Sequence, residues 1–128
     1  MKRLAKIFIA GGGGFIGKSL IDKFNENITI GASSRKKIYI KKKNLFLYKR
    51  DISKKWNINF SPDVIIFSLQ GKYKNGKKPK LEENFNSQIL ALRNCIKFYK
   101  KKKCKLLIFF SSMEVYGKIK ISKIDENT

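Results

Sequence analysis

Apolar residues in this chain are concentrated in short runs that glycine and polar residues separate. Such runs occupy residues 4–9, 28–32, 44–48, 61–70 and 105–110. Their β-branched and aromatic residues and their nearly continuous apolar character are typical of strands buried on both faces of a parallel sheet. The run at 61–70 opens with a turn, so its strand is expected to start near Val64.

Two further segments repeat their apolar residues at helical spacing. The first contains Ile16, Leu20, Ile21 and Phe24 and ends near residues 25–27. The second starts at Leu81 and continues through Phe85, Ile89, Leu92, Ile96 and Tyr99. Acidic residues in the first turn of this longer segment and lysines at its end suit the helix dipole. The alternation predicts an α/β fold, a doubly wound parallel sheet of about five strands with helices on both faces.

Length and composition limit the chain to one domain. It has 128 residues, 42% of them hydrophobic, which is enough for a single core and too few for two. The sequence has no apolar run long enough to cross a bilayer and no signal-peptide cleavage site, so we expect a cytoplasmic protein without membrane contact. Cys95 and Cys104 are isolated and histidine is missing, so neither a metal site nor a disulfide framework is expected.

The chain is strongly basic. It carries 30 Lys and Arg residues against 9 Asp and Glu residues, a formal net charge of +21 that favours anionic partners. Only Arg3, Arg35, Arg50 and Arg93 are arginines. Base-specific recognition usually relies on Arg and on stacking aromatic residues, which the lysine runs lack. Nucleic acid is therefore not the expected partner, although polyanion binding remains an alternative.

A glycine-rich stretch joins the first predicted strand to the first predicted helix. Gly11, Gly14 and Gly17 have the spacing G-x-x-G-x-x-G, a variant of the dinucleotide-binding fingerprint in which the backbone passes close to a pyrophosphate. Glycine also permits the tight turn, and the N–H groups at the following helix start attract an anion. The sequence thus predicts a Rossmann-type sheet that binds a dinucleotide.

The end of the second predicted strand indicates which dinucleotide. An acidic residue about 20 residues beyond the first glycine would bind the ribose 2′-hydroxyl of NAD, whereas basic residues accommodate a 2′-phosphate. This chain has Ser34, Arg35 and Lys36 there and no acid. NADP(H) is therefore favoured over NAD(H).

Four motifs together resemble the extended short-chain dehydrogenases/reductases, the NAD(P)-dependent sugar-nucleotide epimerases and dehydratases. They are the glycine stretch 10–17, Asp51-Ile52, the run 62–66 and Ser111-Ser112-x-x-Val115-Tyr116-Gly117, in family order. The resemblance implies a cofactor-binding domain over 1–117, followed by a polar tail over 118–128. It also implies a site for pyrophosphate (Gly11, Gly14, Phe15, Ile16, Gly17), adenine (Asp51, Ile52), and the ribose and nicotinamide (Phe67, Ser68, Leu69, Gln70). A turn or helix-cap role for Asp51 is the alternative.

The resemblance also implies catalytic roles near the end of the chain. Ser112 would hydrogen-bond the reacting sugar hydroxyl, and Glu114 matches the base of dehydratase members, with a surface or capping role as its alternative. Met113 stands where those members have an acid, which disfavours a 4,6-dehydratase and leaves epimerase, decarboxylase and reductase chemistry open.

The family's catalytic Tyr and Lys are expected roughly 20 to 30 residues beyond Gly117 and thus outside this chain. The pairs at Tyr39, Tyr73, Tyr99 and Tyr116 have the spacing Y-x-x-x-K but do not follow the fifth strand on a helix. We therefore expect the N-terminal part of a nucleotide-sugar enzyme, incomplete relative to the family, without its substrate domain and inactive alone. The fifth strand would expose an edge, and the 81–100 helix resembles one through which family members dimerise. A non-catalytic NADP(H)-binding module is the alternative.

Overall fold

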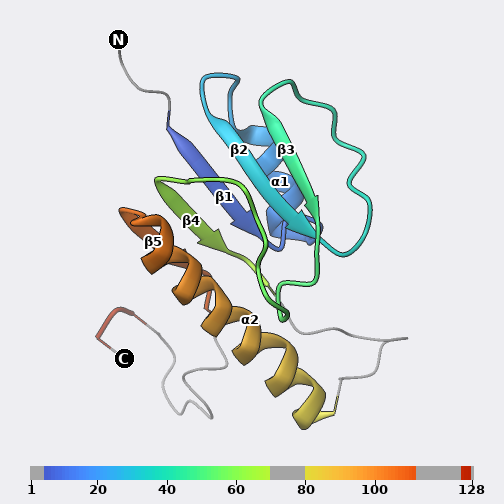
Figure 1. The fold of residues 1–128 in the computed structure, drawn as a ribbon, viewed down its shortest axis with the longest axis vertical. Helices are drawn as coiled ribbons and strands as arrows, with labels where there is room; N and C mark the ends of the chain where they lie inside the picture. The colour runs from blue at the N-terminus through green and yellow to red at the C-terminus, as the bar shows by residue number, and fades with distance from the viewer. Residues whose placement is uncertain (1–4, 70–79, 112–124, 128) are drawn as a thin grey trace.

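The computed structural model describes residues 5–69, 80–111 and 125–127, which contain a five-stranded parallel sheet and two helices (Figure 1). The elements in chain order are β1 (Lys6–Ala10), α1 (Phe15–Lys23), β2 (Thr29–Ser34), β3 (Leu45–Lys49), β4 (Val64–Phe67), α2 (Leu81–Lys102) and β5 (Leu106–Phe109). The strands lie in the order β3-β2-β1-β4-β5, and each neighbouring pair is parallel. The predicted doubly wound α/β fold is confirmed.

The strand order reverses direction at β1. The chain runs outward from β1 through β2 to β3, and then returns to place β4 on the other side of β1. Connections that leave β1 and β4 toward opposite faces open a crevice beyond their carboxyl ends, and ligands of such sheets bind there. The topology thus directs attention to the residues that follow β1, β2, β3 and β4.

Two hydrophobic cores cover the two faces of the sheet. Phe8 and Ala10 of β1 belong to the core under α2, whereas Ile7 and Ile9 belong to the core under α1. This division follows from the strand, because successive side chains point to opposite faces. Figure 1 shows the two helices on opposite sides of the sheet. A strand segment buried on both faces is apolar at every position, as residues 7–10 of β1 are.

Phe8 is the centre of the core under α2. Its side chain is fully buried. Its ring centroid lies 5.6 Å from Trp56, 5.7 Å from Phe98, 6.0 Å from Phe60 and 6.1 Å from Tyr48. Tilted rings at these separations attract one another beyond their burial alone. Phe8 therefore joins β1 to β3, to the segment before β4 and to α2.

The strict alternation of strands and helices holds for only two of the four connections. The structure describes residues 35–44 and 50–63, which join β2 to β3 and β3 to β4, as turns and irregular backbone. Ile52, Ile58 and Phe60 of the second connection are nevertheless buried in the core under α2. Their side chains cover the β3 side of the sheet, a position that a helix could have filled.

β5 exposes apolar side chains at the edge of the sheet, as expected from the sequence. Leu106, Ile108 and Phe109 are 50%, 38% and 51% exposed. Within the described part of the chain, β5 pairs with β4 alone. Unpaired strand edges of this kind favour association with other chains. Neither described helix is long and apolar enough to span a membrane.

Replacement of Phe8 by alanine tests the role of the aromatic cluster. We expect Phe8→Ala to lower the free energy of unfolding by about 3–5 kcal/mol, because a fully buried ring leaves a cavity between four aromatic neighbours. Phe15→Ala is the matched control, since the Phe15 ring is 88% exposed, and its effect should stay within about 0.5 kcal/mol. Urea unfolding followed by tryptophan fluorescence measures both values. Equal effects of the two substitutions would contradict the central position of Phe8.

Candidate dinucleotide site

The glycine stretch forms the turn that the sequence predicted, between the end of β1 and the start of α1. Gly11 has φ +95°, a conformation that side chains disfavour. The N–H of Gly14 donates to the carbonyl oxygen of Gly11 at 3.1 Å and closes the turn. Gly14 is then the N-cap of α1 and offers no side chain to the N–H groups of the first helical turn. Those groups are thus available to an anion, which the dipole of the helix also attracts.

Gly17 allows α1 to begin close to this turn. A Cβ atom on Gly17 would lie 2.3 Å from the carbonyl oxygen of Gly11 and 2.7 Å from Cα of Gly12. Both neighbours are backbone atoms, so they cannot rotate away as a side chain could. The third glycine of the motif is therefore a packing requirement between the helix and the turn, and Gly17 itself does not line the cavity described below.

Two buried serines fix the turn from the neighbouring strands. The N–H of Gly12 donates to the carbonyl oxygen of Ser33 at 2.8 Å, and the N–H of Gly11 lies 3.4 Å from its Oγ. From the other side, the hydroxyl and the N–H of Ser68 donate to the carbonyl oxygen of Ala10 at 3.2 and 2.9 Å. The turn is thus held by both strands that flank β1. Ser68 was among the predicted cofactor contacts, whereas Ser33, a hydroxyl within a buried strand, was not.

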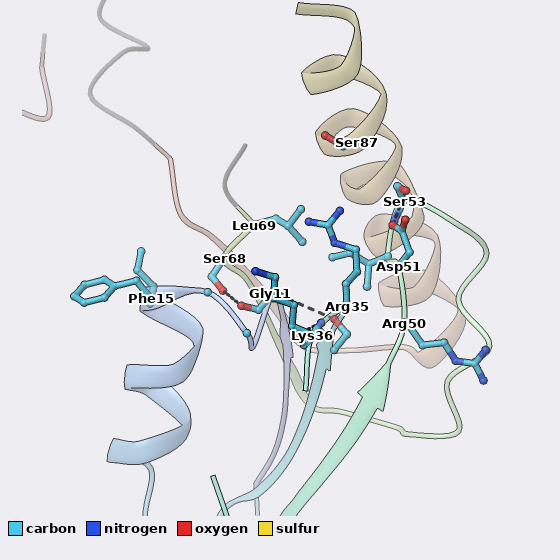
Figure 2. A pocket seen from close by; sticks show the side chains of 16 residues that line it. Gly11, Phe15, Arg35, Lys36, Arg50, Asp51, Ser53, Ser68, Leu69 and Ser87 are labelled. Carbon is cyan, nitrogen blue, oxygen red and sulfur yellow. Dashed lines mark hydrogen bonds between the residues drawn. The ribbon is translucent and has the colours of Figure 1, made fainter. Parts of the chain in front are cut away.

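A cavity of about 440 Å³ lies over this turn and over the carboxyl ends of the four strands that the topology indicated (Figure 2). Eleven of the predicted residues line it: Gly11, Gly14, Phe15, Ile16, Ser34, Arg35, Lys36, Asp51, Ile52, Ser68 and Leu69. Phe15 contributes from its backbone side, because its ring points away from the cavity (Figure 2). The cavity also includes Gly13, Ser33, Arg50, Ser53 and Ser87, which were not among the predicted cofactor contacts.

Among the described residues, Phe67 is a predicted cofactor contact that the structure places away from the cavity. Phe67 lies in the core under α2, where it stacks on Phe109 at 5.6 Å between ring centroids, and it does not line the cavity. This placement follows from strand alternation, since Phe67 and Ile65 point to the same face. Gln70, Ser112 and Glu114 lie outside the described residues.

Cationic side chains gather on the β2–β3 side of the cavity. Arg35 and Lys36 follow β2, and Figure 2 shows both reaching toward the centre of the cavity. Arg50 follows β3 and extends outward from the rim (Figure 2). Its N–H donates to the carbonyl oxygen of Ser34 at 3.0 Å, which continues the pairing of the two strands by one step. The N–H of Lys36 donates to Oγ of Ser34 at 3.2 Å.

Asp51 is the acidic residue of the cavity lining. Its Oδ1 accepts a hydrogen bond from the Ser53 hydroxyl at 2.6 Å and another from the Ser53 N–H at 3.0 Å. The hydroxyl bond is the main cause that holds the pKa of the Asp51 carboxyl below its usual value, and Arg35 and Lys54 add to it. Partial burial acts in the opposite direction. Asp51 is thus ionised near neutral pH and accepts hydrogen bonds.

The two cysteines lie in the core, away from this cavity. Cys95 and Cys104 are free and buried in the core under α2. Burial is the main cause that raises the pKa of the Cys95 thiol to about 12, so the unreactive thiol form prevails at neutral pH. In the described part of the chain, no three His, Cys, Asp or Glu side chains are grouped so that they could hold a metal ion.

Comparisons with known proteins identify the family and the fold. The family model for the NAD dependent epimerase/dehydratase family matches residues 7–128. Among solved structures, a UDP-galactose 4-epimerase superposes with a TM-score of 0.76 at 23% identity, over 91% of this chain and 41% of its own. The Bordetella bronchiseptica enzyme WbmG in complex with NAD gives 0.73 at 18% identity, over 94% and 42%. The Campylobacter jejuni UDP-Glc/GlcNAc 4-epimerase gives 0.73 at 16% identity, over 95% and 41%.

These likenesses concern the fold, and the chain spans about 41% of the length of such structures. A search of curated proteins finds no match.

Two glycine substitutions test whether α1 depends on its close contact with the turn at Gly17. We expect Gly17→Ala to lower the free energy of unfolding by about 1–3 kcal/mol, because the added methyl group meets backbone atoms that must shift. Gly14→Ala is the matched control, since its Cβ would lie 3.5 Å from the Gly11 carbonyl oxygen, an ordinary contact, and should cost less than about 1 kcal/mol. Thermal and urea unfolding measure both. A Gly17→Ala variant as stable as Gly14→Ala would show that α1 does not depend on this contact.

Proposed function

The chain belongs to the NAD dependent epimerase/dehydratase family, and on that premise we propose that it forms the dinucleotide-binding part of an enzyme that acts on a nucleotide-activated sugar. The observation that carries the proposal is the glycine turn under the cavity. Gly11 and Gly17 keep side chains out of the turn, and the start of α1 offers N–H groups without a side-chain cap. This combination suits a pyrophosphate.

The residues around the turn fit the rest of a nicotinamide dinucleotide. Asp51 and Ile52 lie on the β3 side of the cavity, where an adenine would lie, and Ser68 and Leu69 lie on the β4 side, where the nicotinamide ribose would lie. A cavity of about 440 Å³ is in the size range of cofactor sites. The bound nicotinamide would supply hydride transfer, while these residues orient it and exclude water from it.

We further propose that this chain prefers NADP(H). Ser34, Arg35 and Lys36 line the cavity at the end of β2, where NAD-specific folds place an acid for the ribose 2′-hydroxyl. Two cations and a hydroxyl suit a 2′-phosphate better than a diol. The family is described as NAD dependent and WbmG was solved with NAD. The preference is therefore a property proposed for this chain from its own residues.

The activity proposed for the complete protein is transient oxidation of a sugar nucleotide, as in an epimerase or reductase. Ser112 and Glu114 are proposed to contact the sugar, and Met113 disfavours dehydration. Two of the Y-x-x-x-K pairs fall on described residues, and neither Tyr39 nor Tyr99 lines the cavity. This supports the proposal that the catalytic Tyr and Lys belong to another part of the protein. We also propose that the protein forms a homodimer through α2, which exposes the apolar side chains of Ile89, Leu90 and Ile96. The cytoplasm is the proposed location of the protein.

Cofactor binding tests the proposal directly. We expect residues 1–128 to bind NADPH with enhancement of its fluorescence, and to bind NADH more weakly. Arg35→Ala should lower the affinity for NADPH by about tenfold and leave that for NADH nearly unchanged, because a charge-assisted hydrogen bond to the 2′-phosphate is lost. Arg93→Ala is the matched control, since Arg93 is exposed on α2 and does not line the cavity.

Two results would contradict these proposals. Failure to bind either dinucleotide would remove the cofactor function, and equal losses of NADPH and NADH affinity in Arg35→Ala would remove the 2′-phosphate assignment. We also expect no turnover of UDP-galactose or UDP-glucose by residues 1–128 with either cofactor. Sustained turnover by this chain would show that it contains its own catalytic acid and base.

A further inference from the structure

The two oxygens of the Asp51 carboxylate differ in their hydrogen bonding. Both hydrogen bonds from Ser53, from its hydroxyl at 2.6 Å and its N–H at 3.0 Å, end on Oδ1. Across the described parts of the chain, no hydrogen bond to Oδ2 is found for this residue. Ser53 therefore occupies one oxygen and fixes the rotation of the carboxylate, which leaves Oδ2 as the acceptor offered to a ligand. Figure 2 shows Ser53 directly beside Asp51 at the side of the cavity nearest α2.

The loop that contains Ser53 is held against α2. Nδ2 of Asn94, on α2, lies 2.9 Å from the carbonyl oxygens of both Ser53 and Lys54. The indole N–H of Trp56 donates to the carbonyl oxygen of Ile52 at 2.7 Å. The Trp56 ring in turn packs against Phe98 of α2 at 5.0 Å. The loop that carries Asp51 is thus fastened to α2 by side-chain hydrogen bonds and by an aromatic contact, although it contains no helix or strand.

The environment of Asp51 favours a carboxylate that only accepts hydrogen bonds. Arg35 and Lys54 lie near enough to favour the charged form, and the Ser53 hydroxyl bond acts in the same direction. An ionised carboxylate has no proton to donate. Its free oxygen attracts an amino group and repels a carbonyl oxygen. Among purine bases, adenine carries an amino group at position 6, whereas hypoxanthine carries an oxygen there.

We propose that Ser53 is a positioning residue for base recognition: by holding Oδ1 of Asp51, it presents Oδ2 to the 6-amino group of adenine, so that the cavity selects adenine over 6-oxopurine dinucleotides. This inference rests on the proposed dinucleotide function and deepens it. It assigns base selectivity to a residue that would not itself touch the base. The alternative role for Ser53, which is only to stabilise the loop, predicts equal losses for every dinucleotide.

The experiment compares NADP⁺ with its hypoxanthine analogue, nicotinamide hypoxanthine dinucleotide phosphate, by isothermal titration calorimetry on residues 1–128. The unmodified chain is expected to prefer NADP⁺ by about tenfold, the value of one hydrogen bond to a charged group. Ser53→Ala should reduce that preference to about threefold or less, through weaker binding of NADP⁺ with little change for the analogue. Ser53→Thr keeps the hydroxyl and should restore the preference.

Ser19→Ala is the matched control, because the Ser19 hydroxyl donates to the Phe15 carbonyl oxygen on the exposed side of α1. It should retain the full preference. Should Ser53→Ala fail to fold, Ser53→Cys, whose thiol is a weak donor, carries the same expectation.

The outcomes distinguish this inference from the function on which it rests. An unchanged preference in Ser53→Ala, or equal losses for both dinucleotides, overturns the positioning role while the cofactor function stands. An unmodified chain that binds both dinucleotides equally also overturns it, because the cavity then does not read position 6. Failure of the unmodified chain to bind either dinucleotide overturns the cofactor function and this inference together.

Discussion

The close approach of α1 to the turn after β1 is the constraint on which the candidate site depends. At Gly17 the helix lies so near the turn that a single methyl group would collide with the backbone of Gly11. Because of this approach, the first N–H groups of α1 lie at the floor of the cavity, next to the strand ends that supply its walls. The serines at 33 and 68 maintain the turn from both flanking strands. The cationic and acidic side chains of the rim then surround a floor of backbone N–H groups.

The parts of the fold that could be predicted are those encoded in local patterns. Strands β1 to β5 and both helices were recognised because buried strands and amphipathic helices require particular spacings of apolar residues. The segment 50–63 shows no such spacing, because Ile52, Ile58 and Phe60 enter the core singly from irregular backbone. Its contribution to the core therefore appears only in three dimensions. The same alternation that predicts β4 could have placed Phe67 in the core, yet the family resemblance directed it to the cavity.

The site was predictable where residue type alone carries the chemistry. Glycines, the cations after β2 and Asp51 each have a sequence signal, and the structure brings them to one cavity. Ser33, Ser53 and Asn94 have none, because their importance arises from backbone groups far away in the sequence. Asn94, for example, binds carbonyl groups of the loop at 53–54 across the interface between α2 and the loop. The net charge of +21 did not help to locate the site, because lysines occur along most of the chain and therefore indicate no particular surface.

The central position of β1 has a consequence for synthesis on the ribosome. β1 is made first, yet its two neighbours in the sheet are β2 and β4, and the rings that bury Phe8 come from as late as α2. β1, β2 and β3 can pair while the chain is still growing, whereas one edge of β1 and its Phe8 face stay open until most of the chain has left the exit tunnel. Until β4 and α2 have emerged, the nascent protein therefore carries an apolar strand with one unpaired edge, of the kind that chaperones for extended apolar segments recognise.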